Sequence, residues 1–213
     1  MQITSASNSI SDWQALGKLA LQNKNILNYA PYIDGQALVS FDGSVSGALI
    51  RGVDATYEPK VDDITQAIIA GSFASLNQES FNIVIGKDLA HQLGAGIGDK
   101  ITLITPDGNV SPVGMTPRLK QFTITGLFDT HMQQYDSGLI FIGLKQAQIL
   151  FKVPDSVTGV RLKVNDVLQT QSIKEQLYAA LPGDLIVQDW MSQNQNYFSA
   201  VALEKKMMFV ILS

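Results

Sequence analysis

One segment, residues 105–121, limits the possible folds of this chain more than any other. It lies between two apolar runs that predict strands, Lys100–Ile104 and Gln121–Phe128. Three of the chain's seven prolines lie inside it: Pro106, Pro112 and Pro117. Because proline fixes φ and has no backbone donor, we expect the segment neither to pair into a sheet nor to continue a helix. An ordinary hairpin needs only roughly 2–5 connecting residues, so the sequence predicts a protruding loop that docks onto a partner protein.

The middle of this segment, Pro112-Val-Gly-Met-Thr-Pro117, is apolar but has neither helix nor strand periodicity. It places Val113 and Met115 at the tip of the loop. Two arrangements are open: the tip docks into a partner, or the loop folds back and buries both side chains in its own domain. Prolines restrict the free loop, and this lowers the entropy lost on docking.

The composition excludes several classes of function. The chain has 213 residues, a net charge of −4 and an isoelectric point near 5.0, so no basic surface is expected to bind nucleic acid. It has no cysteine, which excludes disulfides, thiol catalysis and cysteine-ligated metals. A chain of this length can bury a hydrophobic core in one large domain or in two small ones.

Hydrophobic periodicity and turn residues predict an α+β fold. Strands are expected at 26–33, 36–41, 46–53, 82–86, 100–104, 121–128, 139–142, 159–164 and 185–187. Helices are expected at 11–23, 61–70, 87–93, 144–151 and 167–181. Asp34-Gly35 is predicted to separate the first two strands, and Asp42-Gly43 to form a hairpin turn before the third.

The order of these elements suggests two lobes and a membrane connection. Residues 1–72 and 158–200 are predicted to form a discontinuous subdomain, a sandwich of strands and helices. Residues 73–157 are predicted to form a smaller, strand-rich subdomain inserted into it. From Trp190 a long helix is expected, and its end at 201–213 begins a truncated transmembrane helix, because Met-Met-Phe-Val-Ile-Leu is an unusual end for a soluble domain. A C-terminal helix that packs its last turn onto the domain is the alternative.

The candidate chemical motifs favour structural roles. Gly94-x-Gly96-x-Gly98 follows a helix and precedes a strand, so it predicts a helix end and a tight turn rather than a dinucleotide site. His91 and His131 have no companion histidine at metal-ligand spacing. The acidic neighbours Asp54, Glu58 and Asp62-Asp63 are expected to form a solvated helix start, without calcium. We therefore predict no catalytic residues, no metal and no cofactor.

Three groups of residues, in this order, resemble one protein family. They are Ile83–Gly94 with Gly98-Asp99, Ser111–Pro117 with Phe122–Phe128 and Asp136, and Gln188–Trp190 with Asn196–Phe198 and Glu204–Met208. Together they resemble the periplasmic domain of LolC-type lipoprotein-releasing permeases, including the fused LolF form, nearly from end to end. The resemblance implies an ABC transporter permease of the inner membrane whose periplasmic domain has a porter-like part and an inserted part.

The same resemblance implies a set of partners. Such transporters draw lipoproteins from the inner membrane and pass them to the periplasmic chaperone LolA, which holds acyl chains in an apolar cavity. ATP hydrolysis belongs to a separate LolD-type cytoplasmic subunit, so this domain is not expected to be an enzyme. The second permease subunit is either LolE-like or identical to the first.

The resemblance also implies which residues grip LolA. The hook of LolC-type members corresponds here to Pro112, Val113, Gly114, Met115, Thr116 and Pro117. Arg118 and Lys120 are implied as a positively charged pad below the chaperone. Here the chain departs from the family, because Leu119-Lys120 replaces a Gln-Arg pair and so loses a guanidinium at that position.

Two other functions are open. The domain can transmit mechanical force in a MacB- or FtsX-like permease, whose partner is an adaptor or a cell-wall hydrolase and whose long loop binds nothing. A hydrolase that uses Asp129, His131 or Asp136 is the third possibility, although no Gly-x-Ser-x-Gly nucleophile motif accompanies them.

Overall fold

The longest strand of the computed structural model, β2 (Ile26–Phe41), takes part in two groups of strands. The structure describes residues 1–7, 9–111, 114–166, 169–181 and 184–189, and of residues 107–111 and 114–116 it describes the backbone alone. Predicted elements beyond residue 189, including the long helix and the start of a transmembrane helix, lie outside the described residues. Among the described helices, none is both long enough and apolar enough to cross a membrane.

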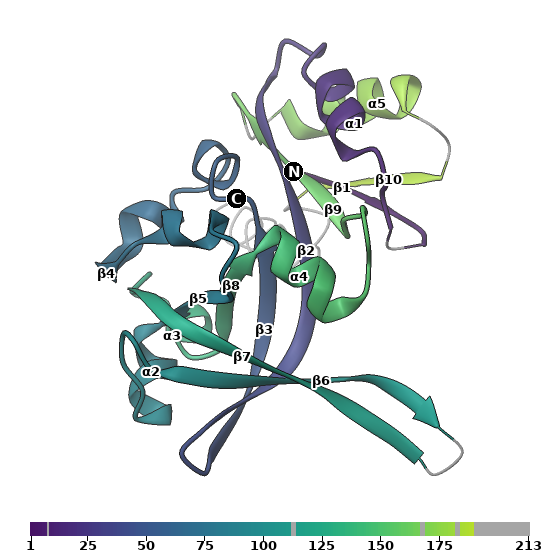
Figure 1. Ribbon diagram of the computed structural model, residues 1–213. Coiled ribbons are helices and arrows are strands. Elements are labelled where there is room, and N and C mark those ends of the chain that lie inside the picture. Colours follow the sequence, from purple (N-terminus) through teal and green to yellow (C-terminus); the bar gives the residue numbers. More distant parts are fainter. Residues whose placement is uncertain (8, 112–113, 167–168, 182–183, 190–213) are drawn as a thin grey trace, which may run out of the picture.

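The first group is an antiparallel sheet built on the N-terminal half of β2. Strand β2 pairs with β9 (Gly159–Val164), β9 pairs with β1 (Gln2–Ser5), and β1 pairs with β10 (Leu185–Gln188). The helices α1 (Trp13–Ala20) and α5 (Thr170–Ala180) lie close together beside this sheet (Figure 1). Both contribute buried residues to the same core as the strands: Trp13, Leu16, Ile173 and Leu177. The strands and helices of this group come from both ends of the chain.

The second group is a ring of six strands that closes on itself. Strand β2 pairs with β3, β3 with β8, β8 with β5, β5 with β7, β7 with β6, and β6 with β2. Their bounds are Ser44–Val53 for β3, Asn82–Gly86 for β5, Lys100–Ser111 for β6, Gly114–Phe128 for β7 and Leu139–Gly143 for β8. Buried residues fill the inside: Val39, Ile50, Ile85, Ile101, Leu103, Phe122, Ile124 and Ile140. The ring is therefore a small barrel with a packed interior.

A second hydrophobic cluster covers one outer side of this barrel. Val84, Phe128 and Phe141 point outward from β5, β7 and β8 and pack against residues of short 3₁₀ segments, including Phe73 and Leu76. The 3₁₀ segments that contribute to this cluster are Ile64–Ala67 and Phe73–Asn77, and the edge strand β4 (Ile68–Gly71) lies between them in the chain. A third 3₁₀ segment, Glu58–Lys60, precedes them and contacts β2. Because both faces of β5 and β8 are covered, every residue of these two strands is buried.

Helix α4 (Leu144–Phe151) packs tightly on β2 and β3. A Cβ atom added to Gly35 would lie 2.3 Å from the Phe151 ring, and one added to Gly52 would lie 2.2 Å from the Cβ atom of Ala147. Both glycines thus allow the helix to approach the strands closely. Two shorter helices, α2 (Lys87–Leu93) and α3 (Gln133–Asp136), lie beside the barrel.

Local signals explain the ends of several of these elements. Asp12 caps α1 by accepting a hydrogen bond from the Ala15 amide at 3.1 Å. Asp42 and Gly43 both have positive φ, 45° and 83°, as a two-residue hairpin turn requires. Gly94, with φ of 73°, ends α2 in the left-handed conformation.

Two predicted elements are wrong. Asp34-Gly35 does not break the strand, because both residues stay in the β2–β3 ladder opposite Arg51 and Ile50. Residues 61–70 do not form an α-helix. They form a 3₁₀ turn followed by β4, which pairs with β7. Pairing with a distant strand has overridden local propensity here.

The boundaries of the two predicted subdomains stay a prediction. Strand pairing crosses them, because β3 from the first range pairs with β8 from the second, and β2 pairs with β6.

Candidate functional site

The most prominent feature outside the body is the hairpin formed by β6 and β7. It extends away from the rest of the chain, at the lower right of Figure 1. Its two strands pair from Lys100 opposite Thr123 outward to Ser111 opposite Gly114. The prediction that residues 105–121 form an unpaired loop is therefore wrong: most of the segment is sheet, although it does project as predicted.

The prolines fit into this hairpin because its ladder is irregular where two of them lie. Regular pairing stops at the Thr105–Arg118 pair and resumes at the Asn109–Thr116 pair. Pro106 and Pro117 both fall in this gap, where no donor is needed from them, and both are exposed. We call residues 106–117, which lie beyond the Thr105–Arg118 pair, the arm.

The predicted hook residues occupy the outer part of the arm. Pro112 and Val113 lie outside the described residues. Gly114, Met115 and Thr116 belong to the backbone of β7, opposite Ser111, Val110 and Asn109. The hook sequence is thus carried at the end of two paired strands, and strand pairing restricts its approach direction more than a free loop would.

Both predicted pad residues make contacts within the chain. Arg118 donates a hydrogen bond from Nη1 to the carbonyl oxygen of Leu150 at 3.3 Å. Lys120 places its ammonium group 3.9 Å from the centre of the Phe81 ring, within range of a cation–π interaction. Arg118 and Lys120 lie two residues apart on β7, at the point where the arm joins the body, which we call the root of the arm. Two positive charges therefore lie at the root.

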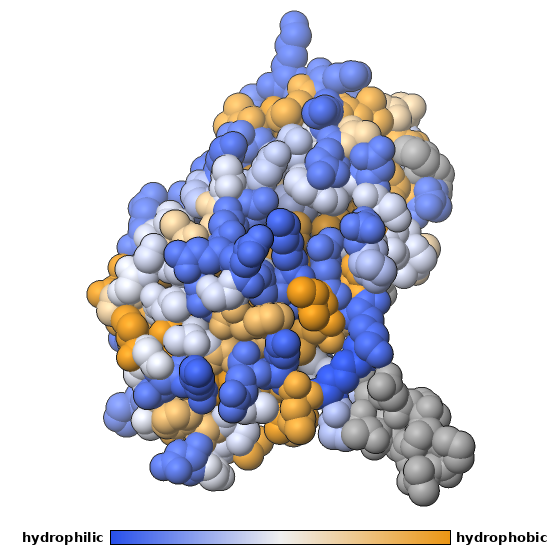
Figure 2. Space-filling model, in the orientation of Figure 1, coloured by the Kyte–Doolittle hydropathy of each residue, from blue (hydrophilic) through white to orange (hydrophobic). Residues whose placement is uncertain are grey.

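An apolar groove of about 690 Å³ lies beside the same root. It is lined by β2, β3, β6 and β7, and its residues include Leu38, Leu49, Ile104, Pro106 and Pro117. Leu38 and Leu49 are 48% and 56% exposed, a large exposure for leucines on a folded sheet. None of the described lining residues is charged. Hydrophobic surface is visible beside the base of the hairpin in Figure 2.

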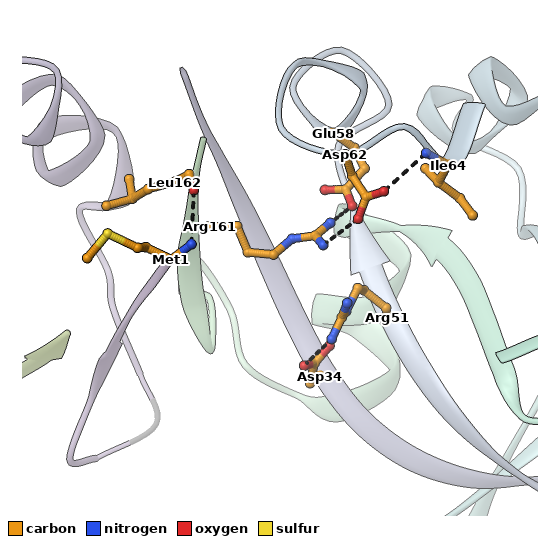
Figure 3. A network of polar contacts seen from close by, with 8 residues as sticks. All are labelled: Met1, Asp34, Arg51, Glu58, Asp62, Ile64, Arg161 and Leu162. Atoms are coloured by element: carbon orange, nitrogen blue, oxygen red, sulfur yellow. Dashed lines mark hydrogen bonds and ion pairs between the residues drawn. The ribbon is translucent and has the colours of Figure 1, made fainter. Parts of the chain in front are cut away.

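A buried ionic network links β9 to the connection between β3 and β4 (Figure 3). Arg161 of β9 forms an ion pair with Glu58 and another with Asp62, the latter at 2.8 Å. The Glu58 side chain is fully buried. Burial, followed by repulsion from Arg51, lowers the pKa of Arg161 to about 10, and the guanidinium therefore stays charged at neutral pH. The prediction of a solvated acidic helix start is wrong for Glu58.

Sequence reasoning missed this network for an identifiable reason. Arg161 lies between Val160 and Leu162, which are both buried, and a charged residue at such a position signals a partner of opposite charge. The sequence does not show which residue is that partner, because Asp62 is 99 positions away in the chain. Next to it, Arg51 and Asp34 form a more exposed bidentate pair with distances of 2.8 and 2.9 Å.

The residues considered for hydrolysis make local structural contacts instead. Asp129 accepts hydrogen bonds from Lys87 Nζ at 2.5 Å and from the His131 amide at 2.9 Å. The Lys87 hydrogen bond, followed by that of His131, lowers the pKa of Asp129 to about 2. Asp136 is buried and accepts hydrogen bonds from the amide and hydroxyl of Thr130. In the described part of the chain, no group of three His, Asp or Glu side chains is placed to hold a metal ion.

The match to a known family is extensive. Residues 1–180 match the model of the MacB-like periplasmic core domain. The chain belongs to this family. Membership is consistent with the strand-rich α+β architecture. The extracellular domain of the noncanonical ABC-type transporter YknZ from Gram-positive bacteria has a similar fold, with a TM-score of 0.58 at 9% identity over 89% of this chain and 99% of that domain.

Within this family, the chain is similar to proteins named LolC. It is 39% identical over 207 residues to the lipoprotein-releasing system transmembrane protein LolC of Neisseria meningitidis serogroup B, covering 97% of this chain and 50% of that protein. It is 35% identical over 202 residues to LolC of Xylella fastidiosa, covering 95% of this chain and 48% of that protein. The chain thus spans about half the length of these relatives. The predicted resemblance to LolC-type periplasmic domains is confirmed.

Proposed function

We propose that this MacB-like domain is the periplasmic part of a LolC-type permease subunit in a lipoprotein-releasing ABC transporter, and that its arm docks the chaperone LolA. The observation that carries the proposal is the paired β6–β7 hairpin, which presents the hook sequence away from the body. The 39% identity to a LolC protein supports the choice of transporter class.

The physics of the arm suits a docking element. Strand pairing and the prolines limit its conformations before binding, so little additional entropy is lost when it is gripped. Val113 and Met115 are the large apolar residues of the hook. Each contributes about 1.5–3 kcal/mol, before binding costs, when fully buried in an apolar cavity such as that of an acyl-chain chaperone. Once the binding costs are subtracted, we expect a modest affinity for the chaperone. A modest affinity allows the chaperone to leave with its cargo.

The root of the arm supplies two further contributions. The charges of Arg118 and Lys120 favour a partner whose rim is acidic, and such charges act mainly on the association rate. The groove with Leu38 and Leu49 lies beside the root, so the rim of a chaperone held by the arm covers it. An interface with an apolar centre and a charged edge is the usual arrangement for specific protein partners.

The whole transporter is part of the same proposal. ATP hydrolysis takes place on a separate LolD-type subunit, and a second permease subunit, LolE-like or identical, completes the membrane part. The cargo consists of lipoproteins bound for the outer membrane. The parent protein lies in the inner membrane, with this domain in the periplasm and residues 201–213 entering the bilayer.

Calorimetric titration of the domain with its cognate LolA tests the proposal. Wild type is compared with Met115→Asp in the hook and with Ile69→Asp on β4, a strand that does not line the groove and whose Ile69 side chain is 56% exposed. Binding by the wild type and Ile69→Asp, but not by Met115→Asp, is the expected result. If the folded wild-type domain does not bind LolA, the arm is not a chaperone hook, and the force-transmitting role of a MacB- or FtsX-like permease takes its place.

A further inference from the structure

The direction of the arm is set at one place, the Thr105–Arg118 pair. Between this pair and the next, Asn109–Thr116, β6 contributes residues 106–108 and β7 contributes Pro117 alone. Unequal strand lengths of this kind bend a hairpin and turn its outer part in a new direction. With proline on both strands, the gap also lacks two of the donors that ordinarily hold a ladder. An additional contact is needed here to keep the arm in one direction.

Arg118 makes such a contact. Its Nη1 donates to the Leu150 carbonyl oxygen, which belongs to the last turn of α4. The last four carbonyl groups of a helix have no partner within the helix, and the negative end of the helix dipole lies there. A guanidinium is therefore a well-matched donor at this position. The other end of the contact is rigid, because Phe151 and Ala147 pack α4 against the glycines of β2 and β3.

Strand alternation places Arg118 on the inner face of the hairpin. Side chains two residues apart on a strand share a face. Arg118 therefore shares its face with Phe122 and Ile124, which are buried in the barrel. Leu119 lies on the opposite face and is 63% exposed. A partner that contacts the outer face of the root meets Leu119, whereas the guanidinium of Arg118 points back toward α4.

From this arrangement we infer that Arg118 is a positioning residue that braces the arm against the C-terminal end of α4. Its hydrogen bond fixes the direction in which the hook is presented, and its role does not depend on direct contact with the partner. The structural role of Arg118 is inferred from its contacts alone. Only its consequence for chaperone binding rests on the proposed function.

A distance measurement without any partner tests the brace. The chain has no cysteine, so cysteines introduced at Asn109 in the arm and at the exposed Lys145 on α4 carry the only two spin labels. Arg118→Met removes the donor and keeps a side chain of similar length. Lys120→Met is the matched control, since it removes one positive charge two residues away without touching α4. Arg118→Ala is the second variant in case Arg118→Met does not fold, because it removes the donor without adding a long apolar side chain.

The brace predicts a distance distribution that broadens or shifts in Arg118→Met and in Arg118→Ala, while Lys120→Met and the unmodified sequence give the same distribution. The melting temperature of each variant shows whether the domain is still folded, so that a change in arm direction is not confused with unfolding. An unchanged distribution in a folded Arg118 variant, or an equal change in Lys120→Met, overturns the inference.

Titration with LolA then distinguishes the effect of a misdirected arm from the effect of a lost positive charge. Loss of the brace weakens LolA binding by about tenfold, the size expected for one hydrogen bond from a charged group, and the loss persists at high salt. A contribution from charge alone is shared by Lys120→Met and disappears at high salt. Should wild type fail to bind LolA, the proposed function falls, and the distance measurement still decides whether the brace exists.

Discussion

Arg161 on β9 and Glu58 in the first 3₁₀ segment form a buried ion pair between the sheet that carries α1 and α5 and the connection between β3 and β4. The carboxylate of Glu58 is fully buried, while 17% of the Arg161 side chain is exposed. A buried charge is costly unless its partner is present. The packing of this connection against the sheet thus depends on both residues.

Removal of one partner should destabilise the domain strongly. Glu58→Ala leaves Arg161 buried with Asp62 as its remaining partner, and we expect a loss of about 3–5 kcal/mol in the free energy of unfolding. The double variant Glu58→Leu/Arg161→Met removes both charges and should recover most of this loss. Urea denaturation at pH 7 measures the free energy of unfolding of the single and the double variant. The more exposed pair Arg51–Asp34 is the control, since Arg51→Ala should cost only about 0–1 kcal/mol.

A double variant that is no more stable than Glu58→Ala would contradict this view of the network. In that case the destabilisation comes from lost packing around residue 58 rather than from an uncompensated charge.

The barrel shows what local sequence signals predict and what they do not. The run Asn82–Gly86 predicted β5, and Asp42-Gly43 predicted the β2–β3 turn, because each signal is complete within a few residues. Closure of the barrel depends on β3 pairing in parallel with β8, some ninety residues further along. Periodicity carries no information on which distant strand is the partner.

The projection of the candidate site from the body was predicted, but its strand pairing was not. The prolines marked residues 105–121 as unusual, and the hairpin does project there. Its pairing was missed because Pro106 and Pro117 lie in an irregular gap of the ladder, where a missing donor costs little. Similarly, the contact of Arg118 with Leu150 depends on how α4 packs, which the sequence of β7 does not reveal.

Acid stability should depend on Asp129. Its folded pKa, about 2, lies below the ordinary value of 3.8, so its contribution is present above pH 4 and is lost as the pH falls from about 4 to 2. Lys87→Met removes the largest cause and should raise the pKa of Asp129 toward 3.8, with the hydrogen bond from the His131 amide keeping part of the shift. Carboxyl carbon NMR titration reads this pKa directly.

The matched control for that titration is Lys145→Met, an exposed lysine on α4. It should leave the pKa of Asp129 unchanged. An Asp129 that titrates at its ordinary value in the wild type would show that the Lys87 contact does not persist in solution.

The apolar groove should matter for binding more than for folding. Leu38→Gln and Leu49→Gln alter side chains that are about half exposed, so each should change the free energy of unfolding by no more than about 0.5 kcal/mol. If the rim of LolA covers the groove, each substitution weakens binding by about 1 kcal/mol. Ile186→Gln on β10, 40% exposed in the other sheet, is the control. If all three variants bind LolA as tightly as the wild type in calorimetry, the groove is not part of the interface.

The final prediction concerns the arm as a whole. Replacement of residues 106–117 by Asn-Gly joins Thr105 to Arg118 through a two-residue turn and leaves the Arg118–Leu150 contact in place. Because the arm extends beyond the last regular pair at its root, the shortened domain should keep its melting temperature to within about 2–4 °C, equivalent to roughly 1 kcal/mol. It should not bind LolA in calorimetry. A much larger loss of stability would instead show that Val113 and Met115 pack on their own domain, because only buried apolar side chains make an excised loop so costly.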